Sequence, residues 1–184
     1  MENYTPEKAG AFFLLLGILE FCIFVNIAAF VDKGYSISNN SISHLGIDST
    51  PYIFNISIII LGICEIISGS FLKSYSKIFT VLLIIGGVGA AGVGIFNEHF
   101  GMVHLSFAIL AFLSPAILSY FAMGKYRNIL GIEWGVMGTI AIIALVLFAS
   151  GIYLGLGMGG MERMILIPNL IWAFQFSAIL YMKK

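Results

Sequence analysis

The stretch Ile78–Phe96 reads IFTVLLIIGGVGAAGVGIF and contains no charged residue. A helix crosses the hydrocarbon of a bilayer with about 20 apolar residues, so this stretch is long enough to span a membrane. Small residues recur along it at helical spacing: Gly86, Gly87, Ala90, Ala91 and Gly94. In lipid, small residues four positions apart let a neighbouring helix approach closely. We therefore expect this stretch to be a transmembrane helix near the centre of a bundle.

The rest of the chain has the same apolar character. Of its 184 residues, 60% are hydrophobic and 10% are charged, and the mean hydropathy is +1.03. A water-soluble domain of this size needs a more polar exterior, so the composition predicts a membrane protein. The formal net charge of zero gives no reason to expect a nucleic-acid partner. Residues 1–184 leave no room for a separate soluble part, which predicts a single transmembrane domain.

The apolar runs predict an all-α, polytopic membrane protein, a compact bundle of six transmembrane helices. The predicted spans are Gly10–Val31, Tyr52–Leu72, Ile78–Phe96, Val103–Met123, Gly135–Leu156 and Met164–Met182. Lysine and arginine gather near the two termini and in the second and fourth connections, so the positive-inside rule places both termini in the cytoplasm. The start, MENYTPEKAG, lacks the basic region of a cleaved signal peptide, so we expect the first span to remain in the mature protein.

Polar residues concentrate on the predicted outer side. The first outer connection, GYSISNNSISHLGIDSTP at residues 34–51, contains Ser41 and Ser43 and is expected to fold over the end of the bundle. Asn26 and Asn55 lie toward the outer ends of the two spans that this connection joins. Amide side chains in spans can form hydrogen bonds between helices. We expect these residues to extend the polar surface of the loop inward.

Two further outer segments carry ionisable side chains. GIFNEHFGMVH, at residues 94–104, contains Glu98, His99 and His104, and all three histidines of the chain fall on the outer side. His99 and His104 are five apart, so only a bend at Gly101 lets both point at one ligand. MERMILIPNLIW, at residues 161–172, places Glu162, Arg163 and Asn169 at the start of the last span. Arg163 is expected either to reach a lipid phosphate or to pair with Glu98.

Two carboxyl side chains fall inside the predicted spans. Glu20 and Glu65 each cost about 3 kcal/mol in hydrocarbon, so each should face the bundle interior and be protonated or paired. Either they form a proton or ion path, or they are neutral groups that fix helix register. Cys22 and Cys64 also lie in spans and are expected to be small packing residues.

The segments SISHLG, GIFNEHFGMVH and MERMILIPNLIW resemble the domain-of-unknown-function 998 family of small prokaryotic integral membrane proteins, and the resemblance covers nearly the whole chain. It implies a six-helix membrane architecture without an established reaction. The positions that match the family's recurrent pattern are Ser41, Ser43, Leu45, Gly46, Glu98, His104, Glu162 and Arg163. His44 departs from that pattern, since an acidic or amide residue is expected there.

The sequence leaves three functions from different classes open. The first is a non-catalytic component that binds membrane lipid or serves as an accessory subunit, with a membrane-protein partner or as a homo-oligomer. The second is an enzyme acting on an outer-leaflet lipid, with His44, Glu98 and His104 as acid-base groups or as ligands of a zinc ion. The third, a proton-coupled transporter, rests on the two intramembrane glutamates. Haem is disfavoured because paired histidines on facing spans are missing.

The glycine-rich run GLGMGG, at residues 155–160, is interpreted as a structural segment rather than a binding loop. It follows a membrane helix rather than a strand, so the context of a dinucleotide-binding loop is absent. We expect the run to reverse the chain and pack helices, with Gly151, Gly155 and Gly159 as a row of small residues at the outer end of the fifth span.

Overall fold

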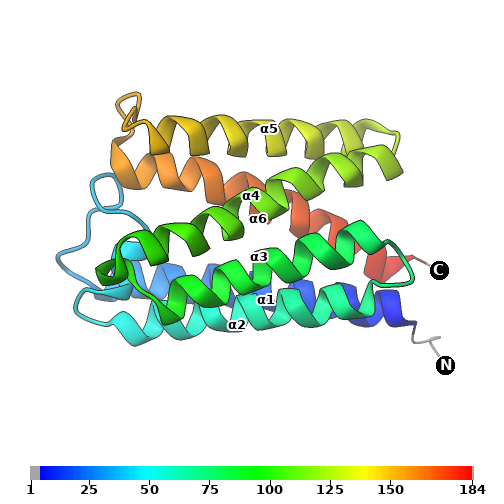
Figure 1. Cartoon of the computed structure of the whole chain (residues 1–184), viewed down its shortest axis with the longest axis horizontal. Helices are drawn as coiled ribbons and strands as arrows, with labels where there is room; N and C mark the ends of the chain where they lie inside the picture. Colours follow the sequence, from blue (N-terminus) through cyan, green and yellow to red (C-terminus); the bar gives the residue numbers. More distant parts are fainter. Residues whose placement is uncertain (1–4, 184) are drawn as a thin grey trace.

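The computed structural model describes residues 5–183 and contains six long α-helices (Figure 1). They are α1 (Pro6–Val31), α2 (Pro51–Phe71), α3 (Lys77–Ile95), α4 (Met102–Lys125), α5 (Ile129–Ala149) and α6 (Gly157–Met182). Each of the six is long and apolar enough to cross a membrane. Two short 3-10 helices, η1 (Ser43–Gly46) and η2 (Glu98–Phe100), lie in the connections. The chain is therefore an all-α, multi-pass membrane protein, as the sequence predicted.

Consecutive helices run antiparallel and pack against one another, and α6 returns to pack against α1 (Figure 1). Helix α1 begins and α6 ends at the same end of the bundle. The opposite end is formed by residues 32–50, 96–101 and 150–156, and is called the capped end below. The three segments predicted to share one side of the membrane thus do lie together.

The fifth and sixth spans differ from the prediction at their bounds. Helix α5 begins at Ile129, where the Asn128 side chain accepts a hydrogen bond from the Gly131 N–H, and it ends at Ala149 rather than Leu156. The chain then turns through Gly151, Leu154 and Gly155, which have positive φ, and α6 begins at Gly157, which also has positive φ. Such angles end a right-handed helix. The expected row of small residues on the fifth span is therefore wrong, because two of its glycines lie in the turn and the third in α6.

Helix α3 packs on both sides through its small residues. A Cβ built on Gly87 would come 2.5 Å from the backbone carbonyl oxygen of Gly62 in α2, and a Cβ on Gly62 would clash with the carbonyl of Gly87 in return. On another face, a Cβ on Gly89 would clash with the backbone of Ala111 in α4. The close approach predicted for this span is confirmed. The glycines of this helix divide between two partner helices, α2 and α4.

Aromatic side chains fill the end of the bundle opposite the capped end. Five rings from three helices and two connections contact one another there, and they belong to Tyr75, Phe79, Tyr126, Trp134 and Phe176, called the aromatic cluster below. Three of them are fully buried. This end is closed by large apolar groups.

Candidate functional site

Glu98 accepts hydrogen bonds from three side chains of the α1–α2 loop. The hydroxyls of Ser41 and Ser43 both donate to its Oε1, the latter at 2.6 Å. Nδ1 of His44 lies 3.2 Å from its Oε2, while Nε2 of the same ring lies 3.7 Å from a carboxylate oxygen of Asp48. The 3-10 turn η1 aligns these loop residues toward η2, which carries Glu98. The carboxylate thereby holds the loop onto the capped end.

The pKa of Glu98 reflects these contacts. Burial raises the pKa of this carboxyl, but hydrogen bonds from Ser41, Ser43 and His44 lower it by more, so the pKa lies below its ordinary value of 4.5. The ionised form is therefore the form that the loop binds.

This shift predicts an acid-sensitive loop. Because the pKa is lower in the folded than in the unfolded chain, ionised Glu98 stabilises the fold above about pH 4.5, and the stabilisation is lost as the pH falls through the folded-state pKa. The wild type should exceed the Glu98→Gln variant in melting temperature by a constant margin above about pH 5 and by less at lower pH. Thermal unfolding of both proteins in detergent across this range measures the margin. An unchanged margin at about pH 3 contradicts the assignment.

Glu162 and Arg163, at the start of α6, hold the same loop from the other side. Glu162 is only 4% exposed, and its Oε2 accepts a hydrogen bond from the backbone N–H of Ile42. The guanidinium of Arg163 donates to the backbone carbonyl of Ile37 at 2.8 Å and to the hydroxyl of Tyr35 at 2.9 Å. Within residues 5–183 this guanidinium has no carboxylate partner, so neither Glu98 nor Glu162 forms an ion pair with it.

Backbone contacts complete the attachment of the loop. The N–H of Gly159 donates to the carbonyl of Ser38 at 2.8 Å, and a Cβ on Gly159 would clash with the carbonyl of Asn40. On α2, the side-chain amide of Asn55 donates to the carbonyl of Gly46 at 2.9 Å. The expectation that the loop folds over the end of the bundle is confirmed.

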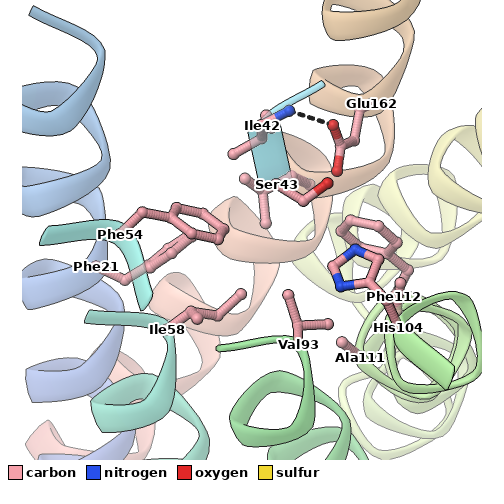
Figure 2. A pocket seen from close by; sticks show the side chains of 12 residues that line it. Phe21, Ile42, Ser43, Phe54, Ile58, Val93, His104, Ala111, Phe112 and Glu162 are labelled. Carbon is pink, nitrogen blue, oxygen red and sulfur yellow. Dashed lines mark hydrogen bonds between the residues drawn. The ribbon is translucent and has the colours of Figure 1, made fainter. Parts of the chain in front are cut away.

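A small cavity lies directly beneath the loop (Figure 2). It offers about 30 Å³ to the centre of a water molecule, which is room for one or two waters. Ser43 and Glu162 lie at its top, and the ring of His104 lies beside Phe112 on one wall. Nδ1 of His104 donates to the carbonyl of Phe96 at 2.8 Å, because a carbonyl can only accept, and this leaves Nε2 as the second polar atom of the ring.

The remaining predicted site residues lie elsewhere. Asn26 is exposed and donates to the Cys22 carbonyl of its own helix, so the structure brings Asn55 but not Asn26 to the loop. His99 is exposed even though Gly101 bends the chain with a φ of 52°, and it does not join His104. Within the described part of the chain, no group of three histidine, cysteine, aspartate or glutamate side chains is placed to hold a metal ion. The trio of His44, Glu98 and His104 is thus not gathered around one point.

The two intramembrane glutamates do not line a common cavity. Glu65 and Asn169 line a second cavity, deeper in the bundle, that Glu20 does not line. No hydrogen bond joins the two glutamates in the region the structure describes, and one carboxylate oxygen of Glu20 is buried without a partner there.

Sequence reasoning missed Tyr35 and the close contact at Gly159. Both residues occur in the quoted segments, but a tyrosine in a polar loop and a glycine in a glycine-rich turn carry no chemical signal of their own. Their roles depend on the docking of residues 36–40 onto the first turn of α6. The only available signal was the shared sidedness of the two segments.

Comparison with known proteins gives one result. The family model described as "Protein of unknown function (DUF998)" matches residues 15–179, which is most of the chain. No curated protein and no solved structure gives a match.

Proposed function

The chain belongs to the DUF998 family, and we propose that it is a non-catalytic membrane protein that binds a lipid by one acyl chain. The proposed binding site is an apolar groove between α5 and α6 beside the capped end. We further propose that the capped end faces away from the cytoplasm. The proposal is carried by the shape and composition of this groove.

The groove has a volume of about 190 Å³ and no charged or polar side chain in its lining. Its residues come from α5, from the turn that follows and from α6, and they are Ile140, Ile143, Ala144, Leu147, Leu154, Leu156, Met161 and Met164. Helices in a bilayer are surrounded by acyl chains, so an apolar hollow on their outer face presents its surface to hydrocarbon. Two flexible methionines let the walls adapt to a chain.

A strained residue shapes the mouth of the groove. Leu154 has a φ of 51° and is 70% exposed. A left-handed conformation costs a residue with a Cβ roughly 1–2 kcal/mol, and it persists only where the surroundings impose it. Leu154 lies in the tight turn between two membrane helices, together with Gly151 and Gly155, whose φ angles are also positive. The result is a leucine side chain that lines the groove at the capped end.

Two further observations support a lipid ligand at this end. Arg163 lies on α6 between Met161 and Met164 of the groove, and its charge is balanced by carbonyl and hydroxyl dipoles rather than by a direct carboxylate contact. Such a cation at an interface attracts a lipid phosphate. The distribution of lysine and arginine supports the proposed orientation.

The hydrogen bonds of the capped end favour binding over catalysis. Glu98 accepts three side-chain hydrogen bonds, and Glu162 accepts one from a loop backbone N–H. A general base needs a lone pair directed at its substrate. Glu98 has these contacts on both of its carboxylate oxygens, and Glu162 holds the loop through Oε2.

The proposal predicts that a bulky side chain in the groove displaces the lipid. Ile143→Trp should lower the lipid that co-purifies with the protein by about tenfold, because the tryptophan takes the contacts that the acyl chain makes. The matched control is Val136→Trp, which also changes an exposed residue of α5 but lies outside the groove. Lipid per protein is measured by mass spectrometry after purification in mild detergent.

Equal lipid content in both tryptophan variants, with melting temperatures like that of the wild type, contradicts the groove as the binding site. Leu154→Gly provides a second test, because it removes the side chain at the mouth while relieving the strain of the turn. It should reduce lipid content without lowering the melting temperature.

A further inference from the structure

We propose that the interior of the bundle contains a hydrated proton-binding site formed by Glu65 and Asn169, reached from the capped end. Its ligands are water and a proton. The site is independent of the α5–α6 groove, because it is enclosed by α1, α2, α3, α4 and α6 and shares no lining residue with the groove. It would make the protein responsive to pH on one side of the membrane.

The site is a cavity near the middle of the bundle. The volume in which the centre of a water molecule fits is about 50 Å³. Since one water needs about 10–15 Å³ on this measure, the cavity has room for more than one. A cavity of this size with an entirely apolar wall stays dry. The wall of this cavity contains the polar side chains of Glu65 and Asn169. The polar groups decide whether it is hydrated.

Asn169 provides the first unsatisfied acceptor. Its side-chain amide donates to the carbonyl of Phe112 at 3.0 Å, which assigns the other atom of the group as Oδ1. That oxygen is buried and has no hydrogen-bond partner among residues 5–183, in a residue that is 4% exposed. A buried acceptor left unpaired costs about 1–3 kcal/mol. A water in the cavity can donate to it.

The backbone of α4 provides a second acceptor. Pro115 has no N–H, so the carbonyl of Ala111 lacks the donor that an uninterrupted helix would supply. Both residues line the same cavity. In a membrane, a carbonyl freed by proline is commonly satisfied by ordered water or a neighbouring side chain. The wall of the cavity thus contains acceptors that need hydrogen atoms.

Glu65 can supply one of these hydrogens when it is protonated. Its carboxyl packs against α3 where Gly86 has no side chain, since a Cβ there would lie 3.3 Å from Oε2. Within the described residues it has no hydrogen-bond or ion-pair partner. An ionised carboxylate at such a depth is costly, whereas a neutral carboxyl donates its O–H to water. Protonated Glu65, water and Asn169 Oδ1 then form a consistent chain of donors and acceptors.

The route for the proton runs toward the capped end. The cavity beneath the loop and the Glu65 cavity share five lining residues, namely Phe21, Ile58, Ala111, Phe112 and Leu166. The two spaces are therefore adjacent, and these side chains form a wall common to both. The upper space contains His104 and Glu162, which are able to exchange protons (Figure 2). The rings of the aromatic cluster pack against one another at the opposite end of the bundle.

Few other titratable groups face Glu65. Of the described residues, Glu20 on α1 and Cys64 beside Glu65 on α2 are the neighbouring titratable groups within the spans, and neither lines the cavity. Helices α3, α4 and α6 contribute no titratable side chain to its wall. Protonation of the cavity is thus a property of Glu65.

Infrared difference spectroscopy of the full chain in phosphatidylcholine vesicles tests the site. The carbonyl stretch of a protonated carboxyl is expected at neutral pH in the wild type and lost in Glu65→Gln, which keeps the side-chain shape. Asn169→Leu should shift the same band, because the water that links the two groups loses its acceptor. Glu20→Gln is the matched control, since it changes an intramembrane carboxyl outside the cavity and should leave this band in place.

Access from the capped end is tested by the rate at which the band shifts in heavy water. Ala111→Leu fills the wall shared by the two cavities and should slow this exchange by about tenfold or more, because a local opening is then required. Ala149→Leu, at an exposed position of α5, should exchange like the wild type. A carboxyl spectrum that is identical in the wild type and in Glu65→Gln overturns the proton site. Equal exchange rates in the two leucine variants overturn the route, and this result stands even if Glu65→Gln does not fold.

Discussion

Gly87→Leu is expected to prevent folding of the bundle. The backbones of α2 and α3 meet at Gly87 and Gly62, and even a single Cβ on Gly87 would come 2.5 Å from the facing carbonyl oxygen. A flexible side chain could move away from such a clash, but a helix backbone cannot move without separating the helices. We expect a loss of more than about 4 kcal/mol, above the usual cost of overpacking a core.

Gly124→Leu is the control for this variant. Gly124 lies in the last turn of α4, and a Cβ added to it would have no atom within 4 Å, so a side chain meets open space there. Replacing glycine inside a helix is expected to stabilise it by about 0.5–1 kcal/mol. Size-exclusion profiles and thermal melting after detergent extraction compare the two variants. A monodisperse Gly87→Leu protein that melts like the wild type would falsify the backbone contact between α2 and α3.

Glu98→Ala is expected to release the α1–α2 loop. The substitution leaves the hydroxyls of Ser41 and Ser43 and the ring of His44 without their shared acceptor. Hydrogen bonds to a charged acceptor contribute about 1.5–3 kcal/mol each, and partial exposure of the carboxylate reduces this, so we expect a loss of about 2–4 kcal/mol. Amide hydrogen exchange in residues 41–46 should rise strongly, while exchange in α5 stays the same.

Asp48→Asn provides the comparison for Glu98→Ala. Asp48 also contacts His44, but at 3.7 Å and with about a third of its side chain exposed, so its loss should change stability by less than about 1 kcal/mol. If the amides of residues 41–46 exchange hydrogen equally slowly in both variants, Glu98 does not hold the loop.

The sequence predicted the six helices because hydrocarbon imposes a simple rule on length and polarity. The bounds of α5 were predicted poorly, because this rule does not determine where a helix begins or ends. The fifth span was predicted to begin at Gly135, whereas α5 begins at Ile129, and Glu133 in its first turns accepts a hydrogen bond from Gln175. The end of α5 depends on positive φ angles at Gly151 and Gly155, and a glycine in a sequence does not reveal its φ.

The candidate site was predictable as a region but not as a set of contacts. Sidedness brought the segments with His44, Glu98 and Arg163 to one end, because charge and span number fix which connections are neighbours. It could not distinguish between partners at that end. For Arg163, one of the two expected partners was Glu98, whereas its guanidinium donates to the Tyr35 hydroxyl and to the carbonyl of Ile37 in the loop. These choices depend on loop conformation, which periodicity does not describe.

The attachment of the α1–α2 loop to α6 also has a consequence for biosynthesis. The partners that meet when Ile42 donates to Glu162 are 120 residues apart in the chain. A ribosome completes the first helical hairpin long before it completes α6. During synthesis the α1–α2 loop therefore exists for a time without its partners on α6. The last helix to be inserted is therefore the one that finishes the first loop, and a chain arrested after α5 would expose residues 36–42 to proteases.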